Sequence, residues 1–524
     1  MSIQSMIDAA MPGDTVSVPP GIYNEQLVID KQLTLQGPDP AQGIAMVDAA
    51  SFPSGSTLTI TSSQVTVRLI SFKDGPGPGI RGGTPQFPDL EDILIEDCTI
   101  TGHQQAGVVT IDSCAMEIAG NLIENNGLIV AGFVKAGIFL YPHGPTNITN
   151  NIIRNNGGDG IFARNSKSGL LIENNVIAGN VNSGITLAWD EQNVSIIGNT
   201  IEDCGLETDD LNGGIAIVQS MAETISGNTI ENCRQRGLVW VWVPTTGPEP
   251  EQVLIVSNQI RHNSHDGIYL FSQGPGSFMP SDIYALKPLM TGNLIENNTG
   301  AGVFVSNGRP YTPGNANPHL ECNSIQENAY GVFNQRAAII DAVNNWWGDS
   351  SGPYHPTENP EGTGNPVSDN IDFIPWCTSA PLPPTTEIDC INVSKMYWAC
   401  KKTLNNELVV DLSKRADGEV TETKCQKVEL LSDPQHRLRA EKIPGTSQVR
   451  VSFYFACSIL FKDSAGWKIV NKPPVFHKET FVVPPLVRDQ RIAADANVYL
   501  ECLECFVSGA KQVTCCLGKL IVLN

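Results

Sequence analysis

The stretches Asn151-Ile-Ile-Arg-Asn-Asn156 and Asn175-Val-Ile-Ala-Gly-Asn180 are two copies of one phrase that recurs through the first part of the chain. In each copy an Asn is followed two positions later by an Ile. The phrase begins at Asn121, Asn151, Asn175, Asn199, Asn228, Asn258, Asn293 and Asn323. The copies lie 24 to 35 residues apart, and a mark that returns at such a period indicates a repeat protein.

A second recurring mark is a Gly followed by Ile, Val or Leu, usually nine residues after the Asn. It falls at Gly137, Gly160, Gly184, Gly214, Gly237, Gly267, Gly302 and Gly331. Short alternating segments between Gly and Asn turns predict a solenoid of β coils, because one coil cannot bury its apolar face without neighbours. About thirteen coils, each ~4.8 Å above the last, would give a rod on the order of 60 Å long.

Two columns of side chains are predicted to stack from coil to coil. The first is an apolar column in the core, made of Ile123, Ile153, Ile177, Ile201, Ile230, Ile260, Ile295 and Ile325. The second is a ladder of side-chain amides, made of Asn126, Asn156, Asn180, Asn263, Asn298 and Asn328. Cys204 and Cys233 replace Asn in two successive coils of this ladder. Their predicted spacing is within disulfide range, and stacked free thiols are the preferred alternative.

Both ends of the repeat region resemble a known family. The opening segment Ile7-Asp-Ala-Ala-Met-Pro-Gly-Asp-Thr-Val-Ser-Val-Pro-Pro-Gly-Ile-Tyr23 is similar to the N-terminal cap of right-handed parallel β-helices of the pectate-lyase-like superfamily. Asn344-Asn-Trp-Trp-Gly-Asp-Ser-Ser-Gly-Pro353 is similar to their closing segment. The resemblance covers nearly all of residues 1–376 and implies this fold. It implies no single activity, because the superfamily includes lyases, hydrolases, epimerases, phage adhesins and proteins with no known catalysis.

Charge and cysteine content divide the chain. Residues 1–376 hold 14 Lys+Arg against 39 Asp+Glu, a net charge of -25, whereas the last 148 residues hold 19 against 16, a net charge of +3. Nine of the 14 cysteines lie from Cys377 onward. The proline-rich stretch 377–386 predicts an extended linker between a domain at 1–376 and one at 387–524. The overall charge of -22 argues against nucleic acid and anionic membranes as partners.

Candidates for catalysis are few, so the sequence favours a protein without catalysis and leaves a carbohydrate-active enzyme as the alternative. Glu202 and Glu231 occupy one column in successive coils, about 5 Å apart, which suits a pair of catalytic carboxylates. Arg261 takes this column in the next coil, so an exposed ladder of charges is the alternative. Asp209 and Asp210 lie in an insertion, where an acidic turn is the alternative to catalysis.

The other acidic positions and motifs do not predict a catalytic site. Asp159 and Asp266 share a column but lie four coils apart, about 19 Å, and cannot cooperate. Tyr141-Pro-His-Gly144 resembles the Asp-Pro-His motif of mannuronan epimerases only superficially. No spacing in residues 1–376 predicts a metal site, and we expect no cofactor.

A surface stripe follows from the alternation of strand residues, since the residue two after each Gly should point outward. This stripe reads Phe139, Phe162, Thr186, Ala216, Val239, Tyr269, Phe304 and Phe333. An apolar, partly aromatic stripe predicts contact with sugar rings or with another protein. Alternatively, insertions at about 244–252, 272–289 and 307–318 cover it. We predict Phe139, Phe162, Tyr269, Phe304, Phe333, Arg309 and Tyr311 as binding residues.

Alternating segments in residues 387–524 predict a smaller antiparallel β-sandwich. The predicted strands are 408–412, 448–461, 467–469, 479–483, 497–507 and 512–522. Candidates for disulfides or cross-links are Cys390, Cys400, Cys502, Cys505, Cys515 and Cys516. Four thiolates at the last four positions could instead bind zinc, although adjacent cysteines in one strand face opposite sides. Free thiols are a third alternative.

The segments Cys390-Ile-Asn-Val-Ser-Lys-Met-Tyr397 and Tyr499-Leu-Glu-Cys-Leu-Glu-Cys505 resemble cysteine-rich domains of spore coat and exosporium proteins. The resemblance implies a cell or spore surface location, reached from the mother-cell cytoplasm, and it agrees with an N-terminus that lacks the features of a secretory signal. Our first hypothesis is a structural or adhesive surface protein that assembles with itself or with other coat proteins. The alternative is a β-helix protein that binds or cleaves polysaccharide.

Overall fold

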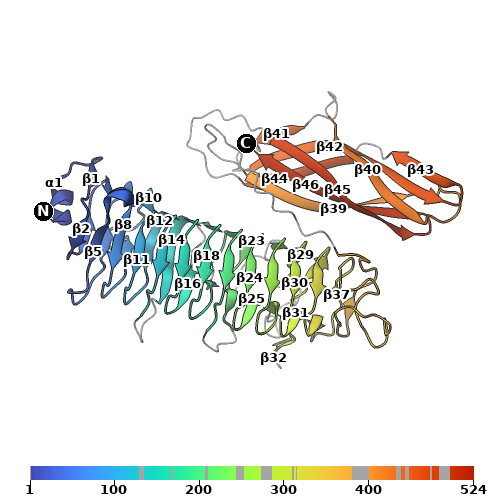
Figure 1. Cartoon of the computed structure of the whole chain (residues 1–524), viewed down its shortest axis with the longest axis horizontal. Coiled ribbons are helices and arrows are strands. Elements are labelled where there is room, and N and C mark those ends of the chain that lie inside the picture. Colours follow the sequence, from blue (N-terminus) through green and yellow to red (C-terminus); the bar gives the residue numbers. More distant parts are fainter. Residues whose placement is uncertain are drawn as a thin grey trace. The chain divides into compact units, whose positions relative to one another are not determined.

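The computed structural model describes residues 2–128, 135–166, 169–189, 191–206, 211–242, 253–272, 286–309, 312–313, 316–380, 400–431, 438–442, 448–471, 475–482 and 496–523. The chain divides into two compact units, residues 1–384 and 385–524, which are described one at a time. The first unit is a stack of parallel β coils, coloured blue to yellow in Figure 1.

One coil shows the plan of the first unit. It contains β17 (Leu170–Glu173), β18 (Val176–Ala178) and β19 (Ile185–Ala188). These pair in parallel with β20 (Val194–Ile197), β21 (Thr200–Glu202) and β22 (Gly213–Val218) of the next coil. Repetition of this pattern gives the solenoid three faces, here called face 1, face 2 and face 3 in the order of the strands in a coil.

The remaining strands follow the same plan. On face 1 lie β1 (Thr15–Ser17), β4 (Leu33–Gln36), β7 (Val65–Arg68), β10 (Ile93–Glu96), β23 (Ala222–Ser226), β26 (Leu254–Val256), β29 (Leu289–Thr291), β34 (His319–Glu321), β37 (Ile340–Asp341) and β38 (Ile371–Asp372). On face 2 lie β2 (Gly21–Tyr23), β5 (Ala45–Asp48), β8 (Ile70–Lys73), β11 (Thr99–Thr101), β13 (Leu122–Glu124), β15 (Ile152–Arg154), β24 (Thr229–Glu231), β27 (Gln259–Arg261), β30 (Leu294–Glu296) and β35 (Ser324–Gln326). On face 3 lie β3 (Leu27–Ile29), β6 (Leu58–Ile60), β9 (Ile80–Gly82), β16 (Asp159–Arg164), β25 (Arg236–Trp242), β28 (Ile268–Ser272), β31 (Ala301–Val305) and β36 (Tyr330–Asn334).

Two long strands turn the corner between faces. β12 (Val108–Ala119) and β14 (Ala136–Thr149) run from face 3 into face 1 and join these faces into one 24-stranded sheet. Face 2 is a separate sheet of 12 strands. A short antiparallel pair, β32 (Gly308–Arg309) and β33 (Thr312–Pro313), and a 3-10 turn, η1 (Pro40–Gln42), lie outside the coils.

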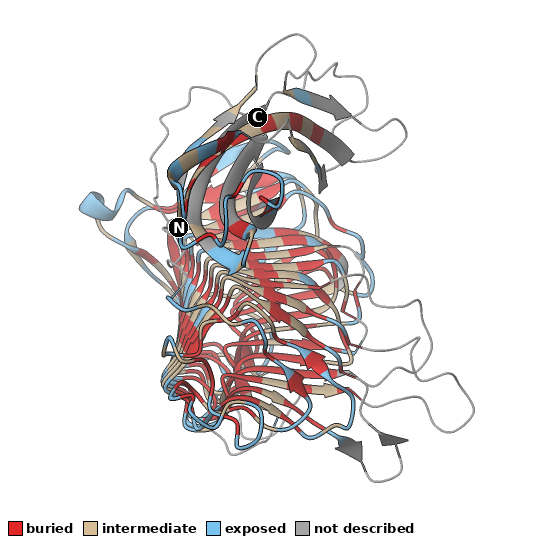
Figure 2. Ribbon diagram, turned by 90° about the vertical axis from the view of Figure 1, so that its right-hand side faces the viewer, coloured by how far each residue is buried: buried red, intermediate tan, exposed pale blue. Residues whose placement is uncertain are grey.

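The predicted Ile column forms the centre of the core. Its members pair in register along face 2, for example Ile177 with Ile201 and Ile201 with Ile230. All eight have zero exposed surface. Figure 2 shows the buried residues lining the inside of the coils. The periodic marks in the sequence therefore predicted the register correctly.

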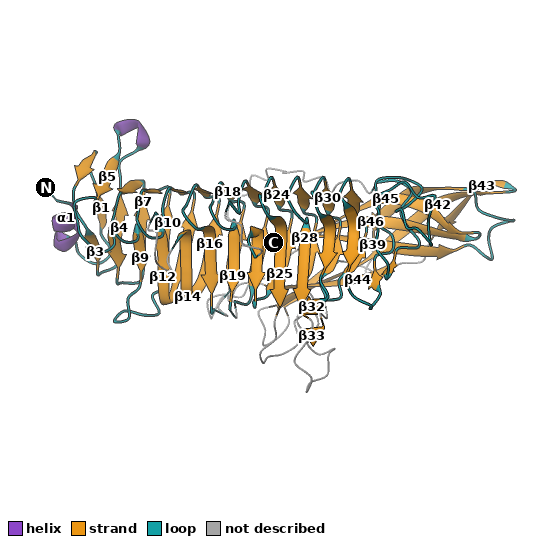
Figure 3. Cartoon of the chain, turned by 90° about the horizontal axis from the view of Figure 1, so that it is seen from below, coloured by secondary structure: helices purple, strands orange, loops and turns teal. Residues whose placement is uncertain are grey.

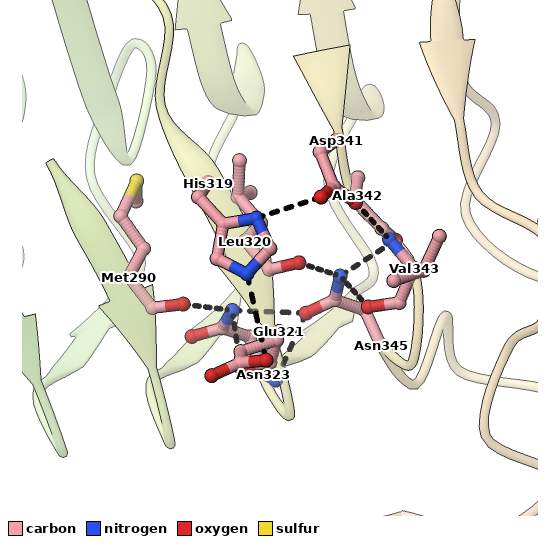
Figure 4. A network of polar contacts seen from close by, with 9 residues as sticks. All are labelled: Met290, His319, Leu320, Glu321, Asn323, Asp341, Ala342, Val343 and Asn345. Carbon is pink, nitrogen blue, oxygen red and sulfur yellow. Dashed lines mark hydrogen bonds and ion pairs between the residues drawn. The ribbon is translucent and has the colours of Figure 1, made fainter. Parts of the chain in front are cut away.

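The predicted amide ladder is present, and the Asn of the Asn-x-Ile phrase forms a second one. In that second ladder, Nδ2 of Asn175 donates to Oδ1 of Asn199 at 2.9 Å and to the Ile148 carbonyl at 2.8 Å. Figure 4 shows its last step, from Asn323 to Asn345. Each amide thus connects its own coil to the coil before it and the coil after it.

Cys204 and Cys233 interrupt the predicted ladder as free, buried thiols. Burial raises the pKa of the Cys204 thiol to about 12. The preferred interpretation from the sequence, stacked thiols without a disulfide, is confirmed.

Both ends of the solenoid are covered. Helix α1 (Ile3–Ala9) lies across the N-terminal end, as Figure 3 shows, and buries Ile3 and Ile7 completely. At the other end the Trp347 side chain is fully buried, and its ring would lie 2.8 Å from a Cβ placed on Gly331. No helix among the described residues is long and apolar enough to span a membrane.

The second unit consists of two antiparallel sheets. One contains β39 (Cys400–Asp411), β46 (Gln512–Leu523) and β45 (Ala496–Gly509), in that order. In the other, β42 (Gln448–Asp463) pairs with β40 (Glu422–Leu430), β41 (Arg439–Lys442), β43 (Gly466–Asn471) and β44 (Val475–Val482). Phe453 and Phe461 of one sheet share a core with Val410 and Val513 of the other, as a sandwich requires. The sequence analysis missed β40 and β41.

We predict that Gly267→Ala destabilises the solenoid by about 1–3 kcal/mol, because the new methyl group overpacks a closed interior. A Cβ at Gly267 would lie 2.7 Å from the Gly302 carbonyl oxygen and 2.9 Å from Nδ2 of Asn298. The control is Gly21→Ala, whose Cβ would lie 3.5 Å from its nearest neighbour, the Tyr23 ring. Calorimetry of the full chain measures both variants, and equal unfolding temperatures would show that the Gly column is not a packing requirement.

Candidate functional site

The predicted outward stripe lies on face 3 in the predicted register. It contains two aromatic stacks. Phe139 and Phe162 lie 5.2 Å apart with an interplanar angle of 6°. Tyr269, Phe304 and Phe333 follow at 5.4 and 5.3 Å. Between the two stacks the side chains are small or fully covered.

The stacking gives the aromatic side chains of the stripe a structural role. Each ring contacts a ring of an adjacent coil, so much of its face is occupied within the chain. Such pairs contribute about 0.5–1.5 kcal/mol each beyond their burial and hold successive coils together. Phe139 is only 6% exposed. The aromatic side chains therefore stabilise the solenoid first, and a ligand needs an open place beside them.

Such an open place lies next to the first stack. It is a hollow of about 310 Å³ across β9, β12, β14 and β16 on face 3. The residues that line it are Pro78, Arg81, Gln105, Val109, Ile111, Phe139, Tyr141 and Arg164. Two of them are cationic, two are aromatic, and none is acidic. We call this site the arginine hollow.

Arg164 is held in place by two aromatic rings. Its guanidinium carbon lies 3.8 Å from the centre of the Tyr141 ring and 5.0 Å from that of Trp189. A hydrogen bond from Arg164 and its positive charge lower the pKa of the Tyr141 hydroxyl, with Asn165 contributing less. The Nε of Arg164 is buried and has no hydrogen-bond partner.

Arg81 is the second cation of the hollow. Its Nε donates to the carbonyl oxygen of Gly83 at 3.3 Å. Within the described parts of the chain, neither Arg81 nor Arg164 lies in an ion pair. Two uncompensated positive charges therefore face one hollow in a region whose net charge is -25.

The predicted carboxylate pair lies elsewhere and has another role. Glu202 and Glu231 pair in register on face 2, as predicted. Nε of Arg261 donates to Oε2 of Glu231 at 2.7 Å. Another cross-coil ion pair on this face joins Arg154 to Glu124. The geometry favours the charge ladder over a catalytic pair.

Several predicted residues lie outside the described part of the chain. These are Asp209, Asp210, Tyr311 and Cys390. Arg309 lies on β32, and its side chain is not described; the same holds for Cys400, Cys502, Cys515 and Cys516 on their strands. Cys505 is disulfide-bonded, which leaves its sulfur unavailable as a zinc ligand. Among the side chains that are described, no three His, Cys, Asp or Glu groups are placed to hold a metal ion.

The Asp159 and Asp266 side chains each accept hydrogen bonds from residues of adjacent coils. Oδ1 of Asp159 accepts hydrogen bonds from Thr186 Oγ1 at 2.6 Å and from Ser183 N at 3.2 Å. Burial raises the pKa of Asp159 to about 6. Asp266 accepts hydrogen bonds from Arg236 and from the backbone of Ala301.

The sequence analysis did not identify the arginine hollow. The sequence does contain a signal for this site. Gly79-Ile80-Arg81 repeats the Gly mark, which places Arg81 in the same outward column as Val109 and Phe139. Tyr141 and Arg164 lie two residues after Phe139 and Phe162 and so also point outward.

We predict that Asp159→Asn stabilises the solenoid at pH 7 but not at pH 4. The folded chain holds the Asp159 proton more tightly than the unfolded chain. The contribution of this group to the free energy of unfolding is therefore complete below about pH 4 and is lost as the pH rises through about 6. The Asn side chain does not titrate and can still accept the two hydrogen bonds. From pH 4 to pH 7, the free energy of unfolding of the variant should rise by up to about 3 kcal/mol relative to that of the parent. A difference in unfolding temperature that does not change with pH would contradict this account.

Comparison with known proteins concerns the first unit. Residues 48–169 and 136–281 match the family model described as right handed beta helix region. No curated protein matches the sequence.

Solved structures are similar at low identity. The A-module of a mannuronan C-5 epimerase from Azotobacter vinelandii has a TM-score of 0.46 and 17% identity, covering 71% of this chain and 94% of that one. The catalytic unit of an α-1,3-glucanase from Streptomyces thermodiastaticus has a TM-score of 0.44 and 19% identity, covering 71% and 66%. The Dettilon tailspike protein has a TM-score of 0.35 and 12% identity, covering 100% and 90%. From the family match and the parallel coils, residues 48–281 form part of a right-handed parallel β-helix, the fold implied by the resemblance to the pectate-lyase-like superfamily.

Proposed function

We propose that the solenoid binds an acidic polysaccharide on face 3, with an anionic sugar unit in the arginine hollow. One observation carries the proposal: Arg81 and Arg164 face a hollow that has no carboxylate among its described lining residues, in a region of net charge -25. A hollow of opposite sign to its surroundings indicates a ligand of negative charge.

The other lining side chains suit a sugar ring. Ile111 is half-buried and provides apolar surface for the carbon face of a pyranose, whereas Val109 and Phe139 are almost completely covered. Gln105 offers an amide to the hydroxyl groups of the sugar. Guanidinium groups bind carboxylate or sulfate through charge-assisted hydrogen bonds. Arg164 is fixed between two rings before any ligand arrives, so little side-chain entropy is lost on binding.

The charge of the remaining surface adds selectivity. The acidic residues elsewhere on the first unit repel a polyanion, whereas the two arginines attract it locally. A polyanion is thereby disfavoured on other surfaces, and such repulsion is a common source of specificity.

Binding is proposed here in preference to cleavage. Hydrolysis of a glycosidic bond commonly uses two carboxyl groups about 5–9.5 Å apart, and none of the described residues that line the hollow has one. The epimerase, glucanase and tailspike structures named above carry no argument about the ligand of this chain. Because their TM-scores are below 0.5, the proposal rests on the hollow itself.

We predict that Arg164→Ala and Arg81→Ala each weaken binding of a polyuronate by about 10-fold to 100-fold, the loss of one charged hydrogen bond. The matched control is Arg154→Ala on face 2, which removes the same charge from an exposed ion pair. Titration calorimetry with a polyuronate, a sulfated glycan and a neutral glucan measures the affinities. Equal loss in Arg154→Ala, or equal binding of the neutral glucan, would contradict the proposal.

A second proposal concerns residues 387–524. We infer from their resemblance to spore coat proteins that this unit anchors the chain at a cell or spore surface and joins it to other copies or coat proteins. The disulfide at Cys505 supports an oxidising location, because disulfides persist in such places.

This second proposal predicts covalent multimers. Non-reducing electrophoresis of native material should show species larger than 56.4 kDa that collapse to the monomer on reduction. A single monomer band, unchanged by reductant, would contradict covalent assembly.

A further inference from the structure

A buried acid–base pair lies behind the arginine hollow. Nε2 of His143 and Oε1 of Glu191 are 3.0 Å apart, and both side chains have zero exposed surface. Removing two such groups from water costs several kcal/mol, and apolar residues of similar volume are often as stable or more stable. Stability alone is therefore a weak reason for the pair.

The His143–Glu191 pair belongs to a network that connects successive turns between face 3 and face 1. Oγ of Ser166 donates to the His143 carbonyl at 2.7 Å, and the Ser166 backbone N donates to Oε2 of Glu191 at 3.1 Å. The Glu191 backbone N donates to Oγ of Ser220 at 3.2 Å. Four consecutive coils are linked through the side chains of His143, Ser166, Glu191 and Ser220.

The same turns carry the residues around Arg164. His143 follows Tyr141 by two positions, Ser166 follows Arg164 by two, and Glu191 follows Trp189 by two. Arg164 lies against both of those rings. The separation of the turns therefore sets the separation of the three side chains.

We propose that the His143–Glu191 pair is a positioning device that holds Tyr141, Arg164 and Trp189 in contact. It acts through its hydrogen bonds and not through its charge. In this role the pair touches no ligand.

The hydrogen-bond pattern explains which substitution should be tolerated. Nδ1 of His143 lies 2.6 Å from the Gly144 carbonyl oxygen, which can only accept, so Nδ1 carries a hydrogen. Nε2 can then accept a hydrogen bond from a neutral group. A Gln at position 191 can donate its NH₂ to Nε2 and accept from Ser166 N with its oxygen. An Ala can do neither.

The test uses the ionisation of Tyr141, which requires no ligand. In the full chain labelled at the tyrosine Cζ carbons, nuclear magnetic resonance follows each phenol with pH, and Tyr141→Phe identifies the signal. In the parent the Tyr141 pKa lies below its ordinary value because Arg164 donates to the hydroxyl. Glu191→Ala should return the Tyr141 pKa toward that value, and Glu191→Gln should leave it as in the parent.

Two results would overturn the inference. One is a folded Glu191→Ala chain in which the Tyr141 pKa stays lowered. The other is a Glu191→Gln chain that changes as much as Glu191→Ala, which would make charge the active property. If Glu191→Ala does not fold, Ser166→Ala removes the bond to the His143 carbonyl, keeps the backbone bond to Glu191, and should shift the Tyr141 pKa upward by less; no shift would again overturn the inference.

A second readout rests on the proposed function. Glu191→Ala should bind the polyuronate about 10-fold more weakly, and Glu191→Gln within about twofold of the parent. If the tyrosine titration behaves as expected while the parent binds no polyuronate, the positioning role stands and the polysaccharide proposal fails. If the parent binds and both variants bind equally well, the positioning role fails.

Discussion

Hydrogen bonds between the buried Asn side chains of successive coils are the constraint on which the solenoid depends. At each turn the chain bends out of the sheet, and its backbone groups would be left unpaired inside the protein, at a cost of about 1–3 kcal/mol each. The Asn199 amide meets this need by donating to the Ile172 carbonyl of the preceding coil, while its Oδ1 accepts from the backbone N of Asn175. Because each Asn of the Asn-x-Ile ladder from Asn121 to Asn323 bonds to the Asn of the next coil, these coils stack in one register.

That register produces the surface. Arg81 and Arg164 are separated by 83 positions in the sequence, yet they line one hollow because their coils stack in step. The aromatic rings beside them stack for the same reason, and this stacking occupies ring faces that would otherwise receive a ligand. The charge of the hollow, opposite to that of its surroundings, therefore indicates the ligand better than its aromatic content does.

The sequence predicted what repeats and not what interrupts the repeat. The Ile column, the amide ladder and the outward stripe follow from the Asn and Gly marks, and the parallel coils agree with all three. His143 and Glu191 lie 48 positions apart in turns of unequal length, so no periodic position relates them. β40 (Glu422–Leu430) was missed because its charged residues obscure the alternation. The hollow depends on side-chain directions in four successive coils, which spacing alone does not give.

The most direct measurement of the central claim is a crystal structure of the full chain with a uronic acid oligosaccharide. The account predicts an ordered sugar in the arginine hollow, with its carboxylate within hydrogen-bond distance of Arg81 or Arg164 and its ring against Ile111. An oligosaccharide ordered on face 1, face 2 or the second unit, with the hollow occupied only by water, would contradict it.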